Sequence, residues 1–491
     1  MKKLTLSEMF KGYTDIDIPA KISNSIPTEI VLSESEAPHD SLLFVTERAD
    51  GQPRNFDYSR VGHTIMAAVV QKAQYDPTAS YVQIPAGNVR AALSYALSNA
   101  YGIDYDKIKI VGVTGTNGKT TTATLIYTIL RQCGYKAGFI GTGKILCNDT
   151  PLCSENYSMT TPDPAVLYPS IAKMIRDGCR YIVMEVSSHS IALNKIAPIK
   201  FEYAIFTNLD NDHLDFHGTK EEYFNTKLKL FSMCKKGLFN LDDKYSGKAS
   251  EMVKCDKSTY GIINPGLTYA TDIEMSLNGT TFFFREKNLI FKIKSDLIGA
   301  FNVYNIIAAV KCTIDLGIKP CIAKAAVEEA HFIEGRMEVL PGKITVIIDY
   351  AHTPFAFYNC LKTIKRSINV KQKLLVVFGC GGQRDRSKRP FFGKYAAELA
   401  DEIIITEDNC RNESFDDIAK DIIAGIVKKG YQVIPDRENA IKYALKSASP
   451  GDVVAIIGKG HERYKIVADQ YIPFDERKIV QETLLQLGGA L

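Results

Sequence analysis

The sequence predicts an α/β protein of three domains, and three observations support this prediction. The chain has 491 residues, too many for one hydrophobic core and enough for about three domains of ~150 residues each. Near residue 115 an apolar strand runs into a glycine-rich turn and a helix, and after residue 335 short apolar runs alternate with helical spans. Such alternation is typical of parallel sheets covered by helices. We therefore expect a small N-terminal α/β domain (1–106), a central domain (107–333) and a C-terminal Rossmann-like doubly wound domain (334–491).

Composition narrows the class of protein. The formal net charge of +4 is small for this length and does not favour nucleic acid as a partner. The 11 cysteines include no Cys-x-x-Cys pair, so neither a zinc site nor a disulfide scaffold is expected. The sequence has no apolar leader and no run of about 18 apolar residues, so we expect a cytosolic protein that does not contact membranes. We also expect the protein to be a monomer.

Each domain has its own expected elements. In the N-terminal domain, strands are predicted at 42–45 and 81–84. In the central domain, the predicted elements are a helix at 120–133, strands at 181–184 and 203–206, and an antiparallel hairpin at 268–294. In the C-terminal domain, strands are predicted at 345–348, 373–378, 402–406 and 452–457, and helices at 389–400 and 438–447.

The most informative segment reads Val-Gly-Val-Thr-Gly-Thr-Asn-Gly-Lys-Thr at 111–120. Two glycines allow a tight turn that points N–H groups inward, while the lysine adds charge and the last threonine offers a hydroxyl to Mg²⁺. The strict phosphate-loop pattern is not met, because Val113 stands where that pattern has glycine. We interpret the segment as an ATP-binding loop, which makes the central domain a P-loop ATPase domain; the alternative is a plain glycine turn. The loop residues expected to hold ATP are Gly115, Thr116, Asn117, Gly118, Lys119, Thr120 and Thr121.

Acidic and basic side chains follow the next two predicted strands. Glu185 ends one strand, where a carboxylate beside a phosphate loop suits Mg²⁺; the alternative is a helix N-terminal acid capped by Ser187. After the other strand, Asn208 and Asp212 could position water and metal, and His213 could serve a second Mg²⁺. The alternatives for that segment are a transition-metal site and an ordinary polar turn.

Two helical segments carry weaker signals. Lys227 lies in 223–231, which has helical spacing, and a lone lysine on a helix is usually solvated. Asn302 and Asn305 share one helical face and could hydrogen-bond an adenine edge, or Asn302 could cap the helix.

In the C-terminal domain, polar residues again follow the predicted strands. Arg336 suits a phosphate and Asp349 a ribose hydroxyl pair, or each could form a surface ion pair. Segment 378–389 places glycines before four cations, which indicates an anionic ligand; these are Arg384, Arg386, Lys388 and Arg389. Segments 408–411 and 458–462 would supply a cation for a carboxylate and an acid for an ammonium, as a zwitterionic amino acid needs.

These motifs, in this order, resemble those of the Mur ligase family, which uses ATP to join a carboxylate to an amine. Within the family they are similar to the MurE type, which adds the third residue to the UDP-N-acetylmuramoyl dipeptide of peptidoglycan. The resemblance implies Mg²⁺ ligation by Thr120, Glu185 and His213, and phosphate contacts from Lys119 and Asn117. It implies further nucleotide contacts from Asn208, Asn305, Arg336 and Asp349. Lys227 matches the family's carbamylated lysine (N6-carboxylysine), which would make it catalytic together with Lys119, Glu185 and His213.

The resemblance also implies the substrates, a UDP-N-acetylmuramoyl dipeptide and a diamino acid joined through an acyl phosphate. Positions that match muramoyl contacts are Thr160, Thr161, Ser187 and Lys195. Positions that match the amino-acid contacts of meso-diaminopimelate enzymes are Arg384, Asp408, Asn409, Arg411, Gly458 and Glu462. The distal carboxylate of diaminopimelate suits a bidentate arginine, so Arg411 favours it over L-lysine or another diamino acid, which remain the alternatives.

Some positions differ from the family pattern. Leu193 and Lys195 stand where MurE enzymes carry Gln and Arg, and Ser33-Glu-Ser35 lies near where an Asp-Ser-Arg signature is common. Recognition of the uridine nucleotide by the N-terminal domain is therefore expected from the order of the domains. A paralogous Mur-type ligase with another acceptor is the enzymatic alternative, and an ATP-binding scaffold is the non-enzymatic one.

Overall fold

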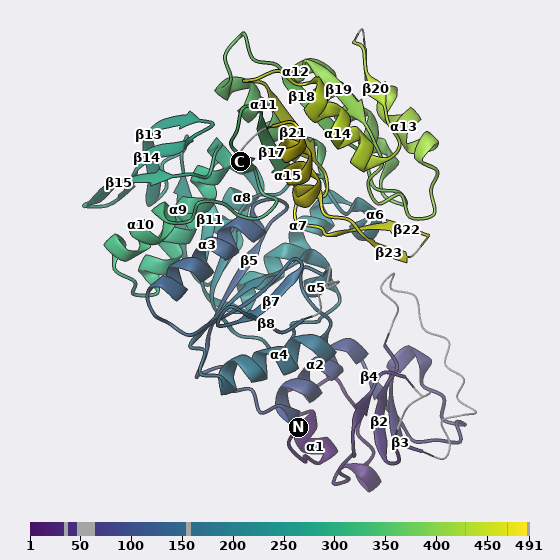
Figure 1. The fold of residues 1–491 in the computed structure, drawn as a ribbon. Coiled ribbons are helices and arrows are strands. Elements are labelled where there is room, and N and C mark those ends of the chain that lie inside the picture. Colours follow the sequence, from purple (N-terminus) through teal and green to yellow (C-terminus); the bar gives the residue numbers. More distant parts are fainter. Residues whose placement is uncertain (34–37, 47–63, 154–158, 428, 469, 489–491) are drawn as a thin grey trace.

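The computed structural model describes residues 1–33, 38–46, 64–153, 159–427, 429–468 and 470–488. Three sheets follow one another along the chain, one in each third of the molecule, and a small two-stranded sheet lies near the C-terminus (Figure 1). The N-terminal part is drawn in purple, and the C-terminal part in green to yellow lies at the opposite end of the molecule. Each of the three larger sheets lies within one of the predicted domains, whose exact boundaries stay a prediction.

The N-terminal part is built on a parallel sheet in the order β1-β2-β3-β4. Its strands are β1 (Ile30–Val31), β2 (Ser41–Phe44), β3 (Ile65–Gln71) and β4 (Gln83–Ala86), and its α-helices are α1 (Leu6–Met9) and α2 (Val89–Ala100). Asn88 begins α2 by accepting a hydrogen bond from the Ala91 N–H. Leu93 of α2 packs in one core with Phe44 and Val69 of the sheet, so this part has the predicted α/β character.

The central part contains an 11-stranded sheet in the order β15-β14-β13-β12-β11-β10-β5-β9-β6-β7-β8. Its strands are β5 (Lys109–Thr114), β6 (Ala137–Gly141), β7 (Lys144–Cys147), β8 (Thr150–Pro151), β9 (Tyr181–Glu185), β10 (Phe201–Phe206), β11 (Cys234–Asn240), β12 (Asp256–Gly261), β13 (Thr268–Ser276), β14 (Gly279–Glu286) and β15 (Leu289–Ser295). The strands from β13 to β6 pair in parallel, and antiparallel strands extend both edges, β14 and β15 on one side and β7 and β8 on the other.

The helices of the central part cover both faces of this sheet. They are α3 (Lys119–Gln132), α4 (Pro164–Arg176), α5 (Ser188–Ala192), α6 (Leu214–His217), α7 (Lys220–Leu228), α8 (Lys244–Met252), α9 (Ala300–Asp315) and α10 (Pro320–Glu328). Successive residues of β5 face opposite sides: Ile110 joins the core that includes α4, and Val111 joins the core of α3, α9 and α10. The predicted strands and the helix after the glycine-rich loop are confirmed within one or two residues.

The segment predicted as one hairpin at 268–294 is a meander of three strands. Its first turn precedes Gly279, as the Asn-Gly signal predicts. A second turn joins β14 to β15 at Lys287 and Asn288, where Lys287 has a φ of 49°. Lysine seldom adopts this left-handed conformation, and the turn contains no glycine. The sequence therefore gives no signal for the second turn.

The C-terminal part has a six-stranded sheet in the order β16-β17-β21-β18-β19-β20, parallel except for the edge strand β16. Its strands are β16 (Glu338–Leu340), β17 (Thr345–Asp349), β18 (Leu374–Phe378), β19 (Glu402–Ile405), β20 (Gln432–Val433) and β21 (Val453–Ile457), and β22 (Tyr464–Val467) pairs with β23 (Gln470–Pro473) in the small sheet. Helices α11 (Pro354–Ser367), α12 (Arg389–Leu399) and α13 (Phe415–Ile423) cover one face, and α14 (Arg437–Ser447) and α15 (Glu476–Gln486) the other. This is the doubly wound arrangement predicted from the alternating pattern.

Two further features bear on the sequence predictions. Within the described part of the chain, no helix is long and apolar enough to cross a membrane. All 11 cysteines are free thiols.

Candidate active site

The glycine-rich loop connects β5 to α3 and is braced by the loop after β10. Gly118 has a φ of 84° and directly precedes α3. At Gly115, with a φ of 142°, an added Cβ would lie 1.9 Å from the Thr207 hydroxyl, so this position requires glycine. The Asn208 side chain accepts from the Asn117 N–H at 2.9 Å and donates to the Asn117 carbonyl at 3.1 Å. Asn208 therefore shapes the loop that is predicted to hold phosphates.

The first charged group of the loop is Lys119, whose ammonium donates to the carbonyls of Gly115 and Thr116 at 3.0 and 2.8 Å. Burial lowers the pKa of Lys119. Next to it, the Thr120 hydroxyl donates to Glu185 at 2.9 Å, and Glu185 is fully buried at the end of β9. The hydroxyl and carboxylate predicted to share a Mg²⁺ ion are therefore adjacent, although they come from different strand ends.

Lys227 of α7 points into the same loop. Its ammonium donates to the Gly115 carbonyl at 2.9 Å and lies 4.5 Å from the centre of the Tyr223 ring. The side chain is 1% exposed, so the expectation of a solvated lysine from its position alone is wrong. Burial, followed by repulsion from Lys119, lowers the pKa of Lys227 well below its usual value. The position matched to the carbamylated lysine thus holds a buried amine that is easier to deprotonate than an ordinary lysine.

His213 lies at the start of α6 and has a φ of 53°, a left-handed conformation that residues other than glycine seldom adopt. Its Nε2 lies 3.3 Å from Asp212, and His352 of the C-terminal part approaches the same carboxylate at 3.9 Å. Burial lowers the pKa of His213 to about 4, which keeps its imidazole neutral and able to bind a cation near pH 7.

Among the residues that the structure describes, no three His, Cys, Asp or Glu side chains are grouped to hold a metal by themselves. Mg²⁺ needs no such cage, because it usually takes one or two carboxylates and completes its shell with phosphate and water oxygens.

A cavity of about 140 Å³ lies between the phosphate loop, α9 and the start of α11. Asn305 lines it and accepts from the Thr122 hydroxyl at 3.2 Å, while its amide donates to Asn302 at 3.0 Å. Asn302 in turn donates to the Ile298 carbonyl at 2.8 Å. The two asparagines therefore form one bonded row along α9. Other residues at this cavity include Asn117, Gly118, Thr121, Asn208, Arg336 and Asp349.

Arg336 connects the C-terminal part to the phosphate loop. Its guanidinium donates to the Thr120 hydroxyl at 3.1 Å and stacks 4.4 Å from the centre of the Tyr350 ring. Its Nε is buried without a hydrogen-bond partner in the described structure, which suits a missing anion. Asp349 accepts from the N–H groups of Met337 and Ala351 at 2.7 and 2.8 Å, and burial raises its pKa. Asp349 thus also fixes the segment where the chain enters the C-terminal part.

The residues matched to muramoyl contacts gather around Glu185. The Thr161 hydroxyl donates to the Glu185 carbonyl and accepts from the Ser187 N–H, and the Thr160 hydroxyl lies 3.0 Å from that of Thr142. Ser187 caps α5, as the alternative interpretation of this segment expects. Its contact with the substrate stays a prediction. The Lys195 ammonium is paired with Asp163 at 2.7 Å. Of the N-terminal signature Ser33-Glu-Ser35, the last two residues lie outside the described part of the chain.

The second and larger cavity, of about 490 Å³, opens between the central and C-terminal parts. Residues that follow four neighbouring strand ends line it: Tyr350 after β17, Gly379 after β18, Asp408 after β19 and Gly458 after β21. This is where ligands bind in doubly wound sheets. Asp212 and His213 line its central side, so the cavity extends from the expected metal site to the expected amino-acid site.

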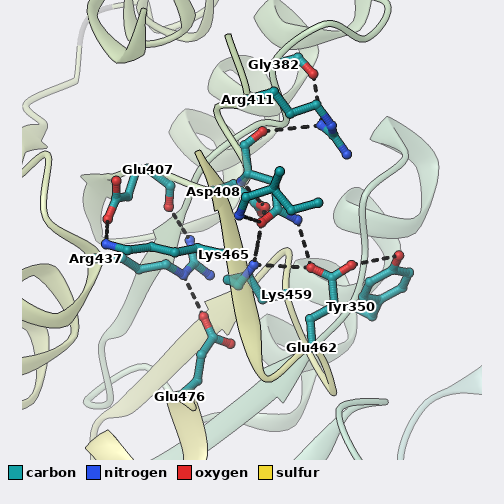
Figure 2. Close-up of polar contacts among 12 residues, drawn as sticks. Tyr350, Gly382, Glu407, Asp408, Arg411, Arg437, Lys459, Glu462, Lys465 and Glu476 are labelled. Carbon is teal, nitrogen blue, oxygen red and sulfur yellow. Dashed lines mark hydrogen bonds and ion pairs between the residues drawn. The ribbon is translucent and has the colours of Figure 1, made fainter. Parts of the chain in front are cut away.

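The residues that are predicted to bind the incoming amino acid all line this cavity. The Asn409 amide donates to Glu462 at 2.8 Å, and the Tyr350 hydroxyl approaches the other oxygen of that carboxylate at 3.4 Å (Figure 2). Arg411 has a φ of 53° and donates through Nη1 to the Gly382 and Asn409 carbonyls. Burial lowers the pKa of Arg411, and the nearby Arg384 lowers it further.

Of the four cations in segment 378–389, two have a structural role. Arg389 is fully buried and binds Glu413 at 2.6 Å and Asp421 at 2.9 Å, and Arg386 also binds Asp421. Arg384 and Lys388 line the large cavity instead. The sequence pattern therefore overstated the charge available to an anionic ligand.

Sequence reasoning missed three residues at the site. Thr142 follows β6 and donates to Glu185 through both its N–H and its hydroxyl, at 2.9 and 3.2 Å. Tyr350 and His352 line both cavities. All three follow strand ends, so the rule that ligands bind beyond strand ends could have found them.

Comparison with known proteins agrees with this geometry. Residues 113–313 match the Mur ligase middle domain, and residues 335–460 match the Mur ligase, glutamate ligase domain. The chain is 34% identical over 484 residues to UDP-N-acetylmuramoyl-L-alanyl-D-glutamate--2,6-diaminopimelate ligase 1 of Clostridium acetobutylicum, covering 95% of this chain and 99% of that one. It is 41% identical over 404 residues to the ligase of that activity from Caldanaerobacter subterraneus subsp. tengcongensis, covering 81% and 83%.

A solved structure of a UDP-N-acetylmuramoyl-L-alanyl-D-glutamate--2,6-diaminopimelate ligase aligns over 99% of this chain and 100% of its own, with a TM-score of 0.69 and 28% identity. The chain belongs to the Mur ligase family. The predicted family, three-part fold and ligase class are confirmed, whereas the roles of the individual site residues stay predictions.

Proposed function

We propose that the protein is an ATP-dependent ligase that joins meso-diaminopimelate to UDP-N-acetylmuramoyl-L-alanyl-D-glutamate, a step of peptidoglycan precursor synthesis. Relatives at 34% and 41% identity carry that activity in their names. The dipeptide supplies a carboxylate, the diamino acid supplies an amine, and ATP is consumed as a substrate.

The observation that carries the choice of amino acid is the pair Arg411 and Arg384. Both line the large cavity, the two guanidinium groups repel each other, and no described carboxylate lies within ion-pair distance of either. A second carboxylate, which diaminopimelate has and lysine lacks, would relieve this repulsion and accept a bidentate contact. Glu462 and Asp408 at the same cavity supply negative charge for an ammonium group.

The reaction follows from this placement. An oxygen of the dipeptide carboxylate attacks the γ-phosphorus of ATP, ADP leaves, and an acyl phosphate forms. The neutral amine then attacks the acyl carbon, the C–O bond to phosphate breaks, and the nitrogen loses a proton to give the amide. Lys119 and the loop N–H groups stabilise charge on the transferring phosphoryl group, so no protein nucleophile is required.

The residues present fit Mg²⁺. Thr120 and Glu185 supply a hydroxyl and a buried carboxylate 2.9 Å apart, His213 supplies a neutral imidazole nearby, and Lys227 would contribute an anion once carbamylated. When bound, Mg²⁺ would neutralise charge on the phosphate oxygens.

Measuring ADP release with meso-diaminopimelate and with L-lysine tests the proposal. We expect kcat/KM to be higher by about 10²-fold or more for diaminopimelate, since its second carboxylate reaches the arginines. Lys119→Ala should abolish ADP release with either amino acid. Equal use of both amino acids would overturn the choice of substrate, and a Lys119→Ala variant with parental ADP release would overturn the role of the loop.

A paralogous ligase with another acceptor is the second candidate, and Lys195 is the observation that favours it. Its ammonium is paired with Asp163, which Arg90 also approaches at 3.5 Å, so a cluster of two cations and one carboxylate stands where the family has an arginine. Comparing ADP release across UDP-muramoyl peptides of different composition decides the matter. Saturable ligation of the Ala-Glu dipeptide would exclude this candidate, and activity with another acceptor alone would establish it.

A further inference from the structure

Lys459 lies at the predicted amino-acid site. Neither the sequence motifs nor the similarity to known proteins gives it a role. It follows β21, between Gly458 and Glu462, and is 0% exposed. Its ammonium donates to the Asn409 side-chain oxygen at 2.9 Å and to Glu462 at 3.1 Å, and lies 3.9 Å from Asp408. Figure 2 shows its ammonium between Asp408 and Glu462. The buried ammonium thus makes two hydrogen bonds and one longer ion-pair contact.

The bond from Lys459 fixes which way the Asn409 amide points. Asn409 Oδ1 accepts from both Lys459 and the Ile466 N–H at 2.9 Å, and the amide nitrogen donates to Glu462. Flipping the amide would place its N–H₂ group against two donors, which would be unfavourable. The Asn409 amide is therefore held as a donor towards the carboxylate that the amino acid is proposed to meet.

The same oxygen of Glu462 receives bonds from Lys459 and Asn409. Among the described residues, the other oxygen has only the long contact to the Tyr350 hydroxyl at 3.4 Å, and Glu462 lines the large cavity. One oxygen of Glu462 is thus anchored by protein groups, and the other remains available to a ligand ammonium group.

The strand ends that carry these residues are clamped together by a second buried cation. Arg437 donates to the Glu407 carbonyl and the Ile457 carbonyl, each at 3.0 Å, and binds Glu476 at 2.5 Å (Figure 2). Glu407 directly precedes Asp408, and Ile457 directly precedes Gly458. Arg437 therefore holds the two loops at a fixed spacing, across which the Lys459 ammonium reaches.

We propose that Lys459 is a positioning residue that orients Asn409 and Glu462 for the ammonium group of the incoming amino acid. The inference rests on the proposed function, because it takes that amino acid to bind between these residues. Lys459 acts through Asn409 and Glu462. It is not among the residues that line the smaller cavity beside the phosphate loop.

The test is a comparison of three Michaelis constants in the full-length enzyme with the Lys459→Met substitution. Removing a charged hydrogen bond to Glu462 should raise the KM for diaminopimelate by about 30-fold, while the KM values for ATP and for the dipeptide change less than about twofold. Lys465→Met is the matched control, because Lys465 belongs to the same region but binds Glu407 at 2.7 Å and has no contact with Asn409. We expect its KM for diaminopimelate to stay within about twofold of the parent.

An unchanged KM for diaminopimelate, or an equal rise in all three constants, would overturn the proposal. If Lys459→Met does not fold, Lys459→Gln tests the charged contact with Glu462 alone, because its amide can still donate to Asn409, and the KM for diaminopimelate should again rise while the other two constants do not. If the parent enzyme uses another amino acid, that amino acid replaces diaminopimelate in the same measurements. Failure of the proposed substrate is therefore distinguishable from failure of the Lys459 assignment.

Discussion

Two fully buried lysines, one in the central part and one in the C-terminal part, have opposite electrostatic surroundings. Lys227 in the central part bonds a backbone carbonyl and faces an aromatic ring, with no carboxylate within ion-pair distance in the described structure. Lys459 in the C-terminal part lies between Glu462 and Asp408. Both side chains are at most 1% exposed, so the difference lies in their partners and not in their burial.

The comparison indicates different chemical fates for the two amines. An ammonium buried without a counter-charge is costly, and burial accordingly lowers the pKa of Lys227 well below its usual value. A neutral amine can attack CO₂, forming an N–C bond and losing a proton to give a carbamate. Lys459, in contrast, balances the charge of its acidic neighbours and so serves the geometry of the site. Lys227 is therefore the lysine suited to modification.

The largest effect is expected from Lys227→Met. The loss of a carbamate near the phosphates should reduce ADP formation by about 10²–10³-fold. Folding should not suffer, because the substitution removes a buried amine that has no counter-charge, whereas Lys459→Met should lower the melting temperature by leaving acids unpaired. Steady-state kinetics and thermal unfolding of both variants measure these effects.

Incubation with carbon-13-labelled bicarbonate gives a direct control for this prediction. A carbamate NMR signal should be present in the parent and absent from Lys227→Met. A parent without that signal, or a variant with parental ADP formation, would remove the contrast between the two lysines.

A smaller effect is expected from Arg411→Lys, which tests a cation that has no carboxylate within ion-pair distance among the described residues. Lysine keeps the charge but loses the planar fork, so the preference for diaminopimelate over L-lysine should fall by about 10–100-fold. The ratio of kcat/KM values for the two amino acids measures this. Arg386→Lys is the control, because Arg386 is paired with Asp421; an equal loss of preference in both variants would contradict the role of Arg411.

The smallest effect is on folding and concerns a cation that has acidic partners. The Arg389 guanidinium holds the pKa of Glu413 at about 2, below its ordinary value of 4.5. Glu413 therefore stabilises the fold above pH 4.5, and this contribution is lost as the pH falls through 2. At neutral pH, Glu413→Gln should lower the free energy of unfolding by about 2–3 kcal/mol.

Denaturant unfolding across this pH range measures the prediction, because the gap between parent and variant should narrow as the pH falls. Glu438→Gln provides a control, since Glu438 forms an exposed pair with Lys442 and should cost at most about 1 kcal/mol. A gap that does not depend on pH would show that the carboxylate charge is not what stabilises Arg389.

The sequence could predict those parts of the site that depend on local signals. The phosphate loop, Glu185 and the apolar strands of the C-terminal sheet are encoded in short runs of residues, and the structure has them where they are expected. The pairing of Arg389 with Glu413, of Lys195 with Asp163 and of Thr142 with Glu185 joins residues at least 24 positions apart. Such contacts depend on strand order and loop path, which one sequence without relatives does not reveal. For the same reason Lys227 could not be told from a solvated lysine by its helical position.

The Thr120 hydroxyl can take part in only a few interactions at once. A hydroxyl has one proton and two lone pairs. Its proton goes to Glu185, and one lone pair accepts from Arg336, which belongs to the other domain. One lone pair is left for a cation. Docking of the C-terminal part and the metal binding that is predicted for Thr120 therefore involve the same oxygen atom, which has no free proton or lone pair once Glu185, Arg336 and a cation are all bound.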